Sequence, residues 1–295
     1  MTEVDSGQAI GLDVGTSRVV VARGRDKQYT YESQLNAFVT VPYSRLTAAL
    51  MARESVFHTV QGSEILIAGN DAQKFAEVFH VELRRPMVDG ILNPREPHSL
   101  AVVRQLITRL VGRSGREGQR LAFSVPAPTI GIETALAYHE ACLHQVLIDL
   151  GYQPTSLSEG LAVIFGELPS SSYTGVAMSF GSGLSNVCLA VLSLPVISFS
   201  VPKAGDFIDS HAALATGELA TRLRVEKEQS FQINGFSENR VHNALTVYYD
   251  EVMRSAVEGL IQACSRSLPK LDQAVPVVLS GGSTMPGGFL GRFNK

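Results

Sequence analysis

The sequence predicts an α/β protein made of two related lobes. A strand, a glycine turn and a second strand occur early, in "AIGLDVGTSRVVVARG" (residues 9–24), and the pattern returns in "TGVAMSFGSGLSNVCLAVLSL" (residues 174–194). After each copy, segments with apolar residues at helical spacing alternate with short apolar runs. A supersecondary unit repeated in the two halves of one chain indicates two lobes with a common architecture.

Length and composition agree with a folded protein of this size. The chain has 295 residues, of which 45% are hydrophobic and 18% charged, which is enough to bury a large core. The formal net charge of -3 argues against a nucleic-acid partner, because such proteins carry a clustered basic face. Cys142, Cys188 and Cys264 are too few and too far apart for a disulfide framework or a Cys-x-x-Cys metal site. With no signal peptide or membrane span expected, these features favour the cytoplasm.

In the first half, strands are expected over 8–14, 18–23 and 64–69, with an irregular segment at about 30–62. Helical spacing predicts a helix over 99–111, and a strand follows over 121–126. The segment 132–152 is expected to be a long helix that Gly151 terminates. A loop then leads to a short apolar helix over 159–168. The expected first lobe covers residues 1–158, with a small insertion at about 30–95.

In the second half, the repeated strands are followed by a strand over 196–202, a turn over 203–209 and a polar stretch to about 238. An amphipathic helix is expected over 239–268, and residues 276–288 read as a buried strand entering a glycine-rich turn. Tyr248, Tyr249 and Met253 lie at helical spacing and are expected in the core or in packing between the lobes, with a partner surface as the alternative. The expected second lobe covers residues 159–295.

The first glycine turn has the composition of a phosphate-binding turn. Gly15 lets backbone N–H groups converge on one point, and the hydroxyls of Thr16 and Ser17 suit phosphate oxygens. Asp13 repels a bare phosphate, so its presence indicates an intervening Mg²⁺. The alternative is that Asp13 caps its own hairpin as an Asx turn. Three further glycine turns, "FGSG" (180–183), "AGDFID" (204–209) and "SGGST" (280–284), favour a nucleotide.

Together these motifs resemble the actin, Hsp70 and sugar-kinase superfamily of two-lobed ATPases. "GLDVGTS" is similar to its first phosphate loop, and "FGSG" stands at the place of its second. "KAGDFID" is similar to its Gly-Gly-x-x-Phe-Asp turn, and "VVLSGGSTMPGG" to its adenosine motif, particularly as bacterial actins and Hsp70 carry it. "VPAP" before a helix and "SEGLAVIFGEL" are similar to its first-lobe connection and interdomain helix. The resemblance covers residues 9–289. It implies an actin-like fold of duplicated RNase H-like lobes, with ATP or ADP and Mg²⁺ in an interlobe cleft.

The resemblance also implies roles for individual residues. Asp13 would lie near the water-coordinated Mg²⁺, and Glu133 is the candidate for positioning the attacking water. A surface helical glutamate is the alternative for Glu133, and Glu140 lies two turns further on. Glu226 and Lys227 would approach ribose or adenine, or else belong to a solvated helix face. The remaining expected nucleotide contacts are Gly15, Thr16, Ser17, Gly181, Ser182, Gly183, Gly205, Asp206, Gly281, Gly282, Ser283 and Thr284.

Several departures from the family pattern affect the expected activity. The second phosphate loop normally begins with Asp and ends in Gly-Thr, whereas this chain has Ser179 and Leu184 at those places. A group that helps hold a metal or polarise water is therefore missing, so binding without hydrolysis, or slow hydrolysis, is expected. The second-lobe insertion is short, and the family's C-terminal strand and helix are expected to be lacking after "SGGSTMPGG".

Three functions remain open at this level. The leading expectation is a bacterial-actin-like cytoskeletal or assembly protein that binds ATP and then favours self-assembly or a protein partner. The chain has no room for the peptide-binding domain of a full Hsp70, and "MVDGIL" (87–92) is similar to a bacterial-actin segment. The alternatives are a sugar-kinase-branch phosphotransferase or small chaperone-like ATPase, and a pseudo-ATPase that uses the fold as a binding platform.

Overall fold

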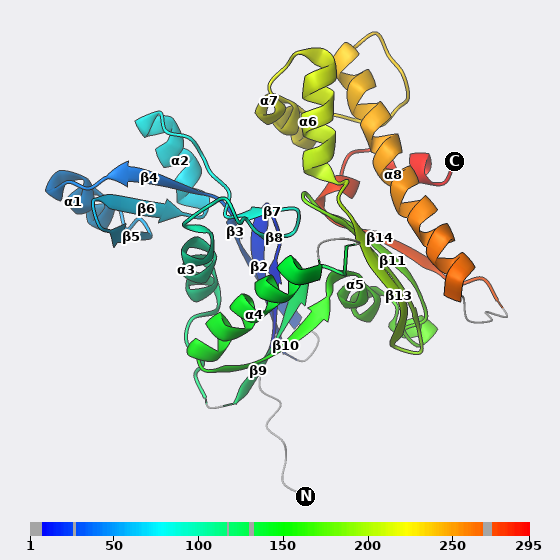
Figure 1. Cartoon of the computed structure of the whole chain (residues 1–295), viewed down its shortest axis with the longest axis horizontal. Coiled ribbons are helices and arrows are strands. Elements are labelled where there is room, and N and C mark those ends of the chain that lie inside the picture. The colour runs from blue at the N-terminus through cyan, green and yellow to red at the C-terminus, as the bar shows by residue number, and fades with distance from the viewer. Residues whose placement is uncertain (1–7, 26–27, 117, 130–132, 268–272) are drawn as a thin grey trace, which may run out of the picture. The chain divides into compact units, whose positions relative to one another are not determined.

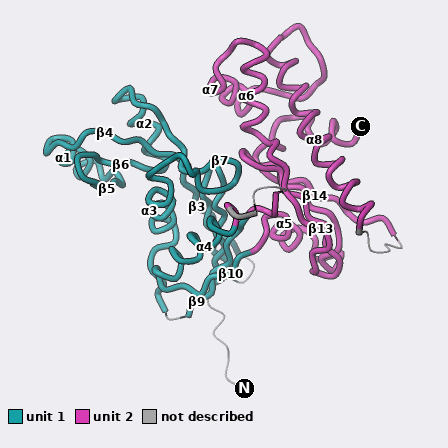
Figure 2. The backbone as a smooth tube through the Cα atoms, in the orientation of Figure 1, with its two compact units in different colours: residues 1–125, 137–156 teal, residues 126–136, 157–295 magenta. Residues whose placement is uncertain are grey.

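The structure is a computed structural model that describes residues 8–25, 28–116, 118–129, 133–267 and 273–295. The chain divides into two compact units, coloured separately in Figure 2. Unit 1 comprises residues 1–125 and 137–156, and unit 2 comprises residues 126–136 and 157–295.

Unit 1 is built on a mixed five-stranded sheet with the strand order β10-β9-β1-β2-β3. The strands are β1 (Ala9–Val14), β2 (Arg18–Arg25), β3 (Gln28–Leu35), β9 (Gln119–Val125) and β10 (Tyr152–Ser158). β1 runs antiparallel to β2 and parallel to β9, and β2 runs antiparallel to β3. Alternate residues of β1 and β2, namely Leu12, Val14, Val19 and Val21, are buried, as expected where one face of a strand packs on a core.

Helices α3 (Ser99–Val111) and α4 (Glu133–Asp149) contribute Leu106 and Leu143 to that core. A smaller three-stranded sheet has the order β4-β6-β5 and a core of its own that includes Met51 and Ile65. Its elements are β4 (Phe38–Pro42), α1 (Arg45–Arg53), β5 (His58–Gln61), β6 (Glu64–Ala68) and α2 (Asn70–Phe79). A two-stranded hairpin, β7 (Met87–Val88) and β8 (Ile91–Leu92), follows it (Figure 1).

Unit 2 repeats the arrangement with a four-stranded sheet of order β13-β12-β11-β14. The strands are β11 (Gly175–Phe180), β12 (Ser185–Val191), β13 (Leu194–Val201) and β14 (Val277–Ser280). One face, including Phe180 and Val187, packs with α6 (Gly205–Thr216) and α8 (Arg240–Ser267), and Tyr249 and Met253 are buried there as expected. The other face, including Cys188, packs with α5 (Glu159–Glu167). Helices α7 (Ala220–Gln229) and α9 (Phe289–Phe293) complete the unit, with 3-10 turns at Pro169–Ser171 and Gly282–Thr284.

The two sheets confirm the predicted duplication at the level of register. In both, an antiparallel hairpin is flanked by a parallel strand, so β1, β2 and β9 correspond to β11, β12 and β14. Asp13 pairs with Val20 across the first hairpin, and Ser179 pairs with Asn186 across the second. Each lies two residues before the glycine of its turn, so Asp13 and Ser179 are equivalent positions.

Three expectations about secondary structure were wrong. The segment 30–62 was expected to be irregular, but most of it lies in β3, β4, α1 and β5. β3 was missed because most of its residues are polar and residues 28–32 are exposed, so no buried apolar face marks the strand. The expected loop after Gly151 is strand β10, which is largely polar. The turn at 203–209 and the polar stretch after it contain α6 and α7. α6 was missed because it begins at a glycine that was interpreted as part of a turn, and α7 because half of its residues are charged.

Among the described residues, no helix is both long enough and apolar enough to cross a lipid bilayer.

Candidate nucleotide-binding turns

The first glycine turn joins β1 to β2 and is closed by one backbone hydrogen bond. Gly15 N donates to Arg18 O over 2.9 Å, so Thr16 and Ser17 form the tip. A Cβ added to Gly15 would lie 3.1 Å from Arg18 O, which is tighter than ordinary van der Waals contact. Glycine at this position therefore permits the close approach that a phosphate-binding turn requires.

Asp13 lies beside this turn, where β1 meets β9. Ser124 Oγ of β9 donates a hydrogen bond of 2.5 Å to Asp13 Oδ1, which orients the carboxyl group. The side chain of Asp13 is exposed, yet the surrounding protein displaces enough water to raise the pKa of its carboxyl, and the Ser124 hydrogen bond opposes that rise. The Asx-turn alternative would require Asp13 to bond its own turn, whereas the contact that the structure shows is to another strand.

The tip of the first turn is held from behind by side-chain contacts. Asn36, which is fully buried, donates from Nδ2 to Gly15 O over 2.8 Å. Thr16 is also buried, and its Oγ1 accepts a hydrogen bond of 3.0 Å from Gly90 N in the turn between β7 and β8. The "MVDGIL" segment therefore forms a hairpin that fixes Thr16, while Ser17 remains partly exposed.

The second glycine turn, between β11 and β12, has the same geometry. Gly181 N donates to Leu184 O over 3.1 Å, and a Cβ on Gly181 would lie 3.1 Å from that oxygen. Ser182 and Gly183 thus form a two-residue tip, as Thr16 and Ser17 do in unit 1.

Three glycine turns of unit 2 are joined to one another. Gly205 N donates to Gly181 O over 3.0 Å, and Asp206 N donates to Ser182 O over 2.7 Å. Ser283 Oγ also donates to Gly181 O, over 2.8 Å. The structure therefore brings the predicted residues 181–183, 205–206 and 281–284 to one place, although they are separated by up to about a hundred positions in the sequence.

The same contacts limit what some of these residues can offer a ligand. The N–H groups of Gly205 and Asp206, at the start of α6, are already bonded to the second turn. Thr284 Oγ1 donates to Gly281 O over 2.8 Å, and Ser283 is buried. These positions shape the turns, whereas exposed Gly282 has open space where a Cβ would lie.

Lys227 and Glu226 point in different directions from α7. Lys227 is 7% exposed; its Nζ lies 2.7 Å from Asp209 Oδ1 and donates to Gly205 O over 3.0 Å. Burial raises the pKa of the Asp209 carboxyl, while Lys227 and Arg224 lower it. Lys227 thus binds the turn at Gly205 from inside the protein.

Arg224 is a charged group of this site that the sequence did not single out. Its guanidinium lies 3.7 Å from Asp206 and 3.5 Å from Asp209, and about a third of its side chain is exposed. The signal in the sequence was its position three residues before Lys227 on α7, which places both residues on one helix face.

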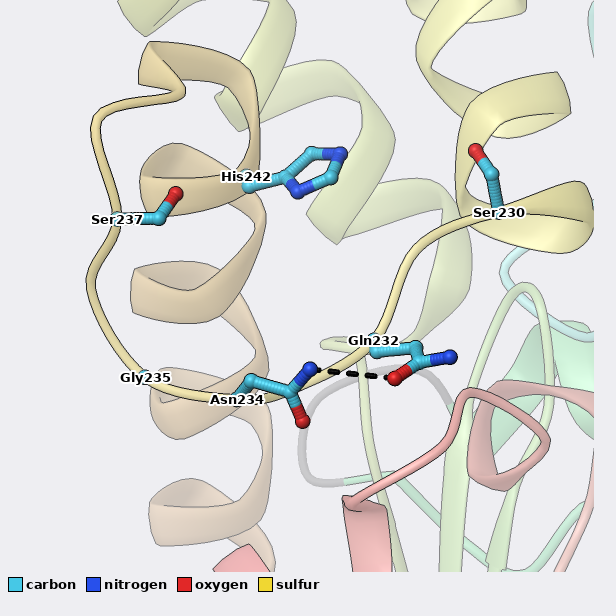
Figure 3. A pocket seen from close by; sticks show the side chains of 6 residues that line it. All are labelled: Ser230, Gln232, Asn234, Gly235, Ser237 and His242. Carbon is cyan, nitrogen blue, oxygen red and sulfur yellow. Dashed lines mark hydrogen bonds between the residues drawn. The ribbon is translucent and has the colours of Figure 1, made fainter.

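Glu226 faces α8 instead, where its Oε1 lies 3.0 Å from His242 Nε2. His242 is also one of six residues that line a hollow open to solvent. Figure 3 shows this hollow between the end of α7 and the start of α8, with Asn234 donating to Gln232 across it. It contains none of the predicted nucleotide contacts. The other lining residues are Ser230, Gln232, Asn234, Gly235 and Ser237.

Glu133 is the first residue of α4. Its side chain lies outside the described residues, so its role stays a prediction.

The residues of the first turn fit a magnesium-phosphate group. Mg²⁺ usually keeps several waters and takes one or two carboxylates in addition to phosphate oxygens. Asp13 supplies an exposed, oriented carboxyl beside the turn. Among the described residues no group of three or more His, Cys, Asp and Glu side chains could hold a metal, so an ion at Asp13 would take its other ligands from water and phosphate.

Comparisons with known proteins point to the same fold. Actin-like protein MamK of Magnetospirillum gryphiswaldense is 22% identical over 284 residues, which is 92% of this chain and 71% of that protein. The structure of a MamK double helical filament superposes with a TM-score of 0.74 at 19% identity, covering 97% of this chain and 89% of that one. The structure of MreB 5 of Spiroplasma citri bound to AMPPNP superposes with a TM-score of 0.68 at 12% identity. The match covers 98% of this chain and 89% of that one.

At these identities the solved structures establish the actin-like α/β fold with two mixed sheets. The profile of the Volactin family matches residues 8–295, nearly the whole sequence. This chain therefore belongs to the Volactin family.

Proposed function

We propose that this chain binds ATP or ADP with Mg²⁺ through its glycine turns and assembles with copies of itself in response. The observation that carries the proposal is the repeated turn: Gly15 and Gly181 each close a two-residue tip with the same backbone hydrogen bond in the two units. Relatives support both halves of it, because MreB 5 has been solved with AMPPNP and with ADP, and MamK as a double helical filament.

In this proposal the two turns have different tasks. The first carries Asp13, so it handles the metal and the phosphates next to it. The second has Ser179 at the equivalent position, and it contributes N–H groups and hydroxyls without a charge. Buried Lys227 and Asp209 hold the start of α6 against the second turn, and Arg224 adds a positive charge close to Asp206.

Calorimetry of AMPPNP and ADP with Mg²⁺ tests nucleotide binding. The Asp13→Ala variant should bind at least about tenfold more weakly, since interactions with charged groups contribute roughly 1.5–3 kcal/mol. Glu77→Ala is the matched control, because it removes one exposed carboxylate of the same unit from α2, away from the turn. Equal affinities of Asp13→Ala and the native chain would contradict the proposed metal role.

Sedimentation of the native chain with and without AMPPNP then tests assembly. Polymer or large oligomer should form with the nucleotide and disappear in Asp13→Ala. A sedimentation profile that never depends on nucleotide would remove the assembly half of the proposal and leave the binding half standing.

A second candidate function is a nucleotide-binding platform with no turnover. Ser179 favours it, because the residue at the position of Asp13 carries no charge to hold a metal or polarise water. Phosphate release should then be undetectable in the native chain and should rise in Ser179→Asp. If the native chain released phosphate from ATP at rates typical of the two-lobed ATPases, and Ser179→Asp did not change that rate, this candidate would be excluded.

A further inference from the structure

The outer edge of β3 is open along its first five residues. β3 ends the strand order of its sheet and pairs with β2 on one side, and no other strand in the described part of the chain pairs with its second side (Figure 1). Residues 28–32 are all exposed, and Tyr29 and Tyr31 are 61% and 69% exposed. Proteins usually protect edge strands against pairing, so an open edge with two neighbouring tyrosines needs an explanation.

The structure shows which backbone groups of β3 point outward. Leu35 N donates to Asn70 Oδ1 over 2.9 Å, and Ser33 O accepts from Asn70 Nδ2 over 3.4 Å. Outward-pointing residues alternate along an antiparallel strand, so the N–H and C=O groups of Tyr31 and Tyr29 also face away from β2. Asn70 caps the edge at Ser33 and Leu35, and it leaves the edge at Tyr29 and Tyr31 open.

We propose that this open edge pairs with the same edge of a second copy of the chain. A twofold axis at Thr30 places Tyr29 opposite the second copy's Tyr31, and Tyr31 opposite its Tyr29. Both pairs join outward-facing residues, so they form four backbone hydrogen bonds between the copies. Thr30 then lies opposite its own counterpart as a non-hydrogen-bonded pair.

The side chains are self-complementary in this register. The four tyrosines gather on one face as two cross-strand aromatic pairs, a favourable combination in sheets. On the other face Thr30 meets Thr30, and the amide of Gln28 meets the carboxylate of Glu32, which Arg23 already neutralises over 2.8 Å. Charge repulsion across the axis is therefore avoided.

Asn70 selects this register over its neighbours. Moving the axis to Tyr31 would pair Tyr29 with Ser33, whose outward carbonyl is already bonded to Asn70. Moving it to Tyr29 would place Tyr31 opposite a position before Gln28, where β3 begins. Among the described residues of β3, the axis at Thr30 is the one that uses the open groups of both tyrosines.

The inference goes beyond the proposed nucleotide function, because β3 contains none of the predicted nucleotide contacts. The dimer should therefore form with or without nucleotide. It joins the five-stranded sheets of two copies edge to edge, which gives any larger assembly a second kind of contact.

Disulfide trapping tests the register directly. Thr30→Cys should cross-link two full-length chains under mild oxidation, because non-hydrogen-bonded pairs lie about 4.5 Å apart between Cα atoms, within disulfide range. Ser33→Cys is the control on the same strand, since its two copies would be about 20 Å apart at about 3.3 Å per residue. The native chain reports any cross-linking by Cys142, Cys188 and Cys264.

A second test perturbs the edge without touching the β2–β3 ladder. Tyr31→Pro removes an outward N–H, and proline is tolerated on an edge strand where its nitrogen faces solvent. Tyr31→Lys keeps the N–H but adds a charge to the tyrosine face. Both should weaken the dimer at least about tenfold in sedimentation equilibrium, given the loss of hydrogen bonds and aromatic pairs.

The outcomes separate this inference from the proposed function. Cross-linking of Thr30→Cys that is no faster than that of Ser33→Cys, or unchanged self-association of Tyr31→Lys, would overturn the edge pairing. Calorimetry of AMPPNP with the same variants shows whether nucleotide binding is intact. A dimer that survives in Asp13→Ala would support the edge pairing even where nucleotide binding fails.

Discussion

Ser124 and Asp13 are joined by a hydrogen bond of 2.5 Å between the Ser124 hydroxyl and Asp13 Oδ1, across the parallel strands β9 and β1. The two residues are 111 positions apart in the sequence. The contact orients the carboxyl group that lies beside the first repeated turn, so the geometry of the candidate metal site depends on a residue that is distant in the sequence.

Ser124→Ala should therefore weaken nucleotide binding in the presence of Mg²⁺ by a smaller factor than Asp13→Ala. The loss of a hydrogen bond that only orients the carboxyl group should cost about 1 kcal/mol, which corresponds to roughly fivefold in affinity. Calorimetry at saturating Mg²⁺ measures the effect, and Ser33→Ala, a serine of the edge strand β3, is the control. An affinity of Ser124→Ala equal to that of the native chain would mean that the hydrogen bond has no positioning role.

Lys227→Met should destabilise unit 2 strongly. It leaves the carboxylate of Asp209, which is 2% exposed, without its closest cation. Breaking one side of a buried ion pair costs about 3–5 kcal/mol. Urea unfolding followed by circular dichroism measures the loss.

The double variant Asp209→Leu with Lys227→Met distinguishes two causes of this destabilisation, an uncompensated buried charge and the loss of a hydrogen bond. Removing both charges should recover much of the stability, because an uncompensated buried charge is the larger cost. A double variant that is as unstable as Lys227→Met alone would show instead that the hydrogen bond from Lys227 to Gly205 O dominates.

His139 should make the stability of unit 1 depend on pH. Its ring is buried, Leu92 N donates to Nδ1 over 3.2 Å, and burial lowers the pKa of the imidazole to about 4. The folded state keeps this histidine neutral, while the unfolded chain binds a proton below its ordinary pKa of 6.5. The contribution of the neutral histidine to the free energy of unfolding should therefore be fully present above pH 6.5, and it should be lost as pH decreases toward 4.

The size of this effect is of order 3 kcal/mol for a shift of that extent. Thermal unfolding of the native chain between pH 4 and pH 7 should show the slope, and His139→Gln should flatten it while keeping an acceptor for Leu92 N. A slope of the same size in His139→Gln would assign the pH dependence to other groups.

Gly281→Ala and Gly282→Ala should differ sharply although the positions are adjacent. Gly281 has a φ of +97°, and its Cβ would lie 2.3 Å from Phe180 O, whereas a Cβ on Gly282 has nothing within 4 Å. Forcing a side chain into the first position should cost about 2 kcal/mol or more. Thermal melts of both variants test this, and similar melting temperatures would show that the turn relaxes easily.

Much of the fold was readable from local pattern. Helix α3 begins and ends at the predicted residues, and the alternating apolar residues of β1 and β2 identified the first hairpin. The glycine-rich turns could also be predicted from the sequence, because Gly15 and Gly181 are needed for the same backbone geometry. What failed locally were segments such as β3 and β10, whose strand conformation comes from pairing with a neighbour.

The sequence by itself therefore determined the duplicated α/β architecture and the candidate phosphate turns, since residue type and spacing are local properties of the chain. Only the tertiary structure decided which polar groups are already bonded: it placed Ser124 on Asp13, Lys227 on Asp209, and Asn70 on the edge of β3. These partners are 35 to 111 positions apart except for Lys227 and Asp209 on neighbouring helices. Hydrogen bonds and ion pairs depend on distances of a few ångströms in space, and no periodicity in the sequence encodes those distances.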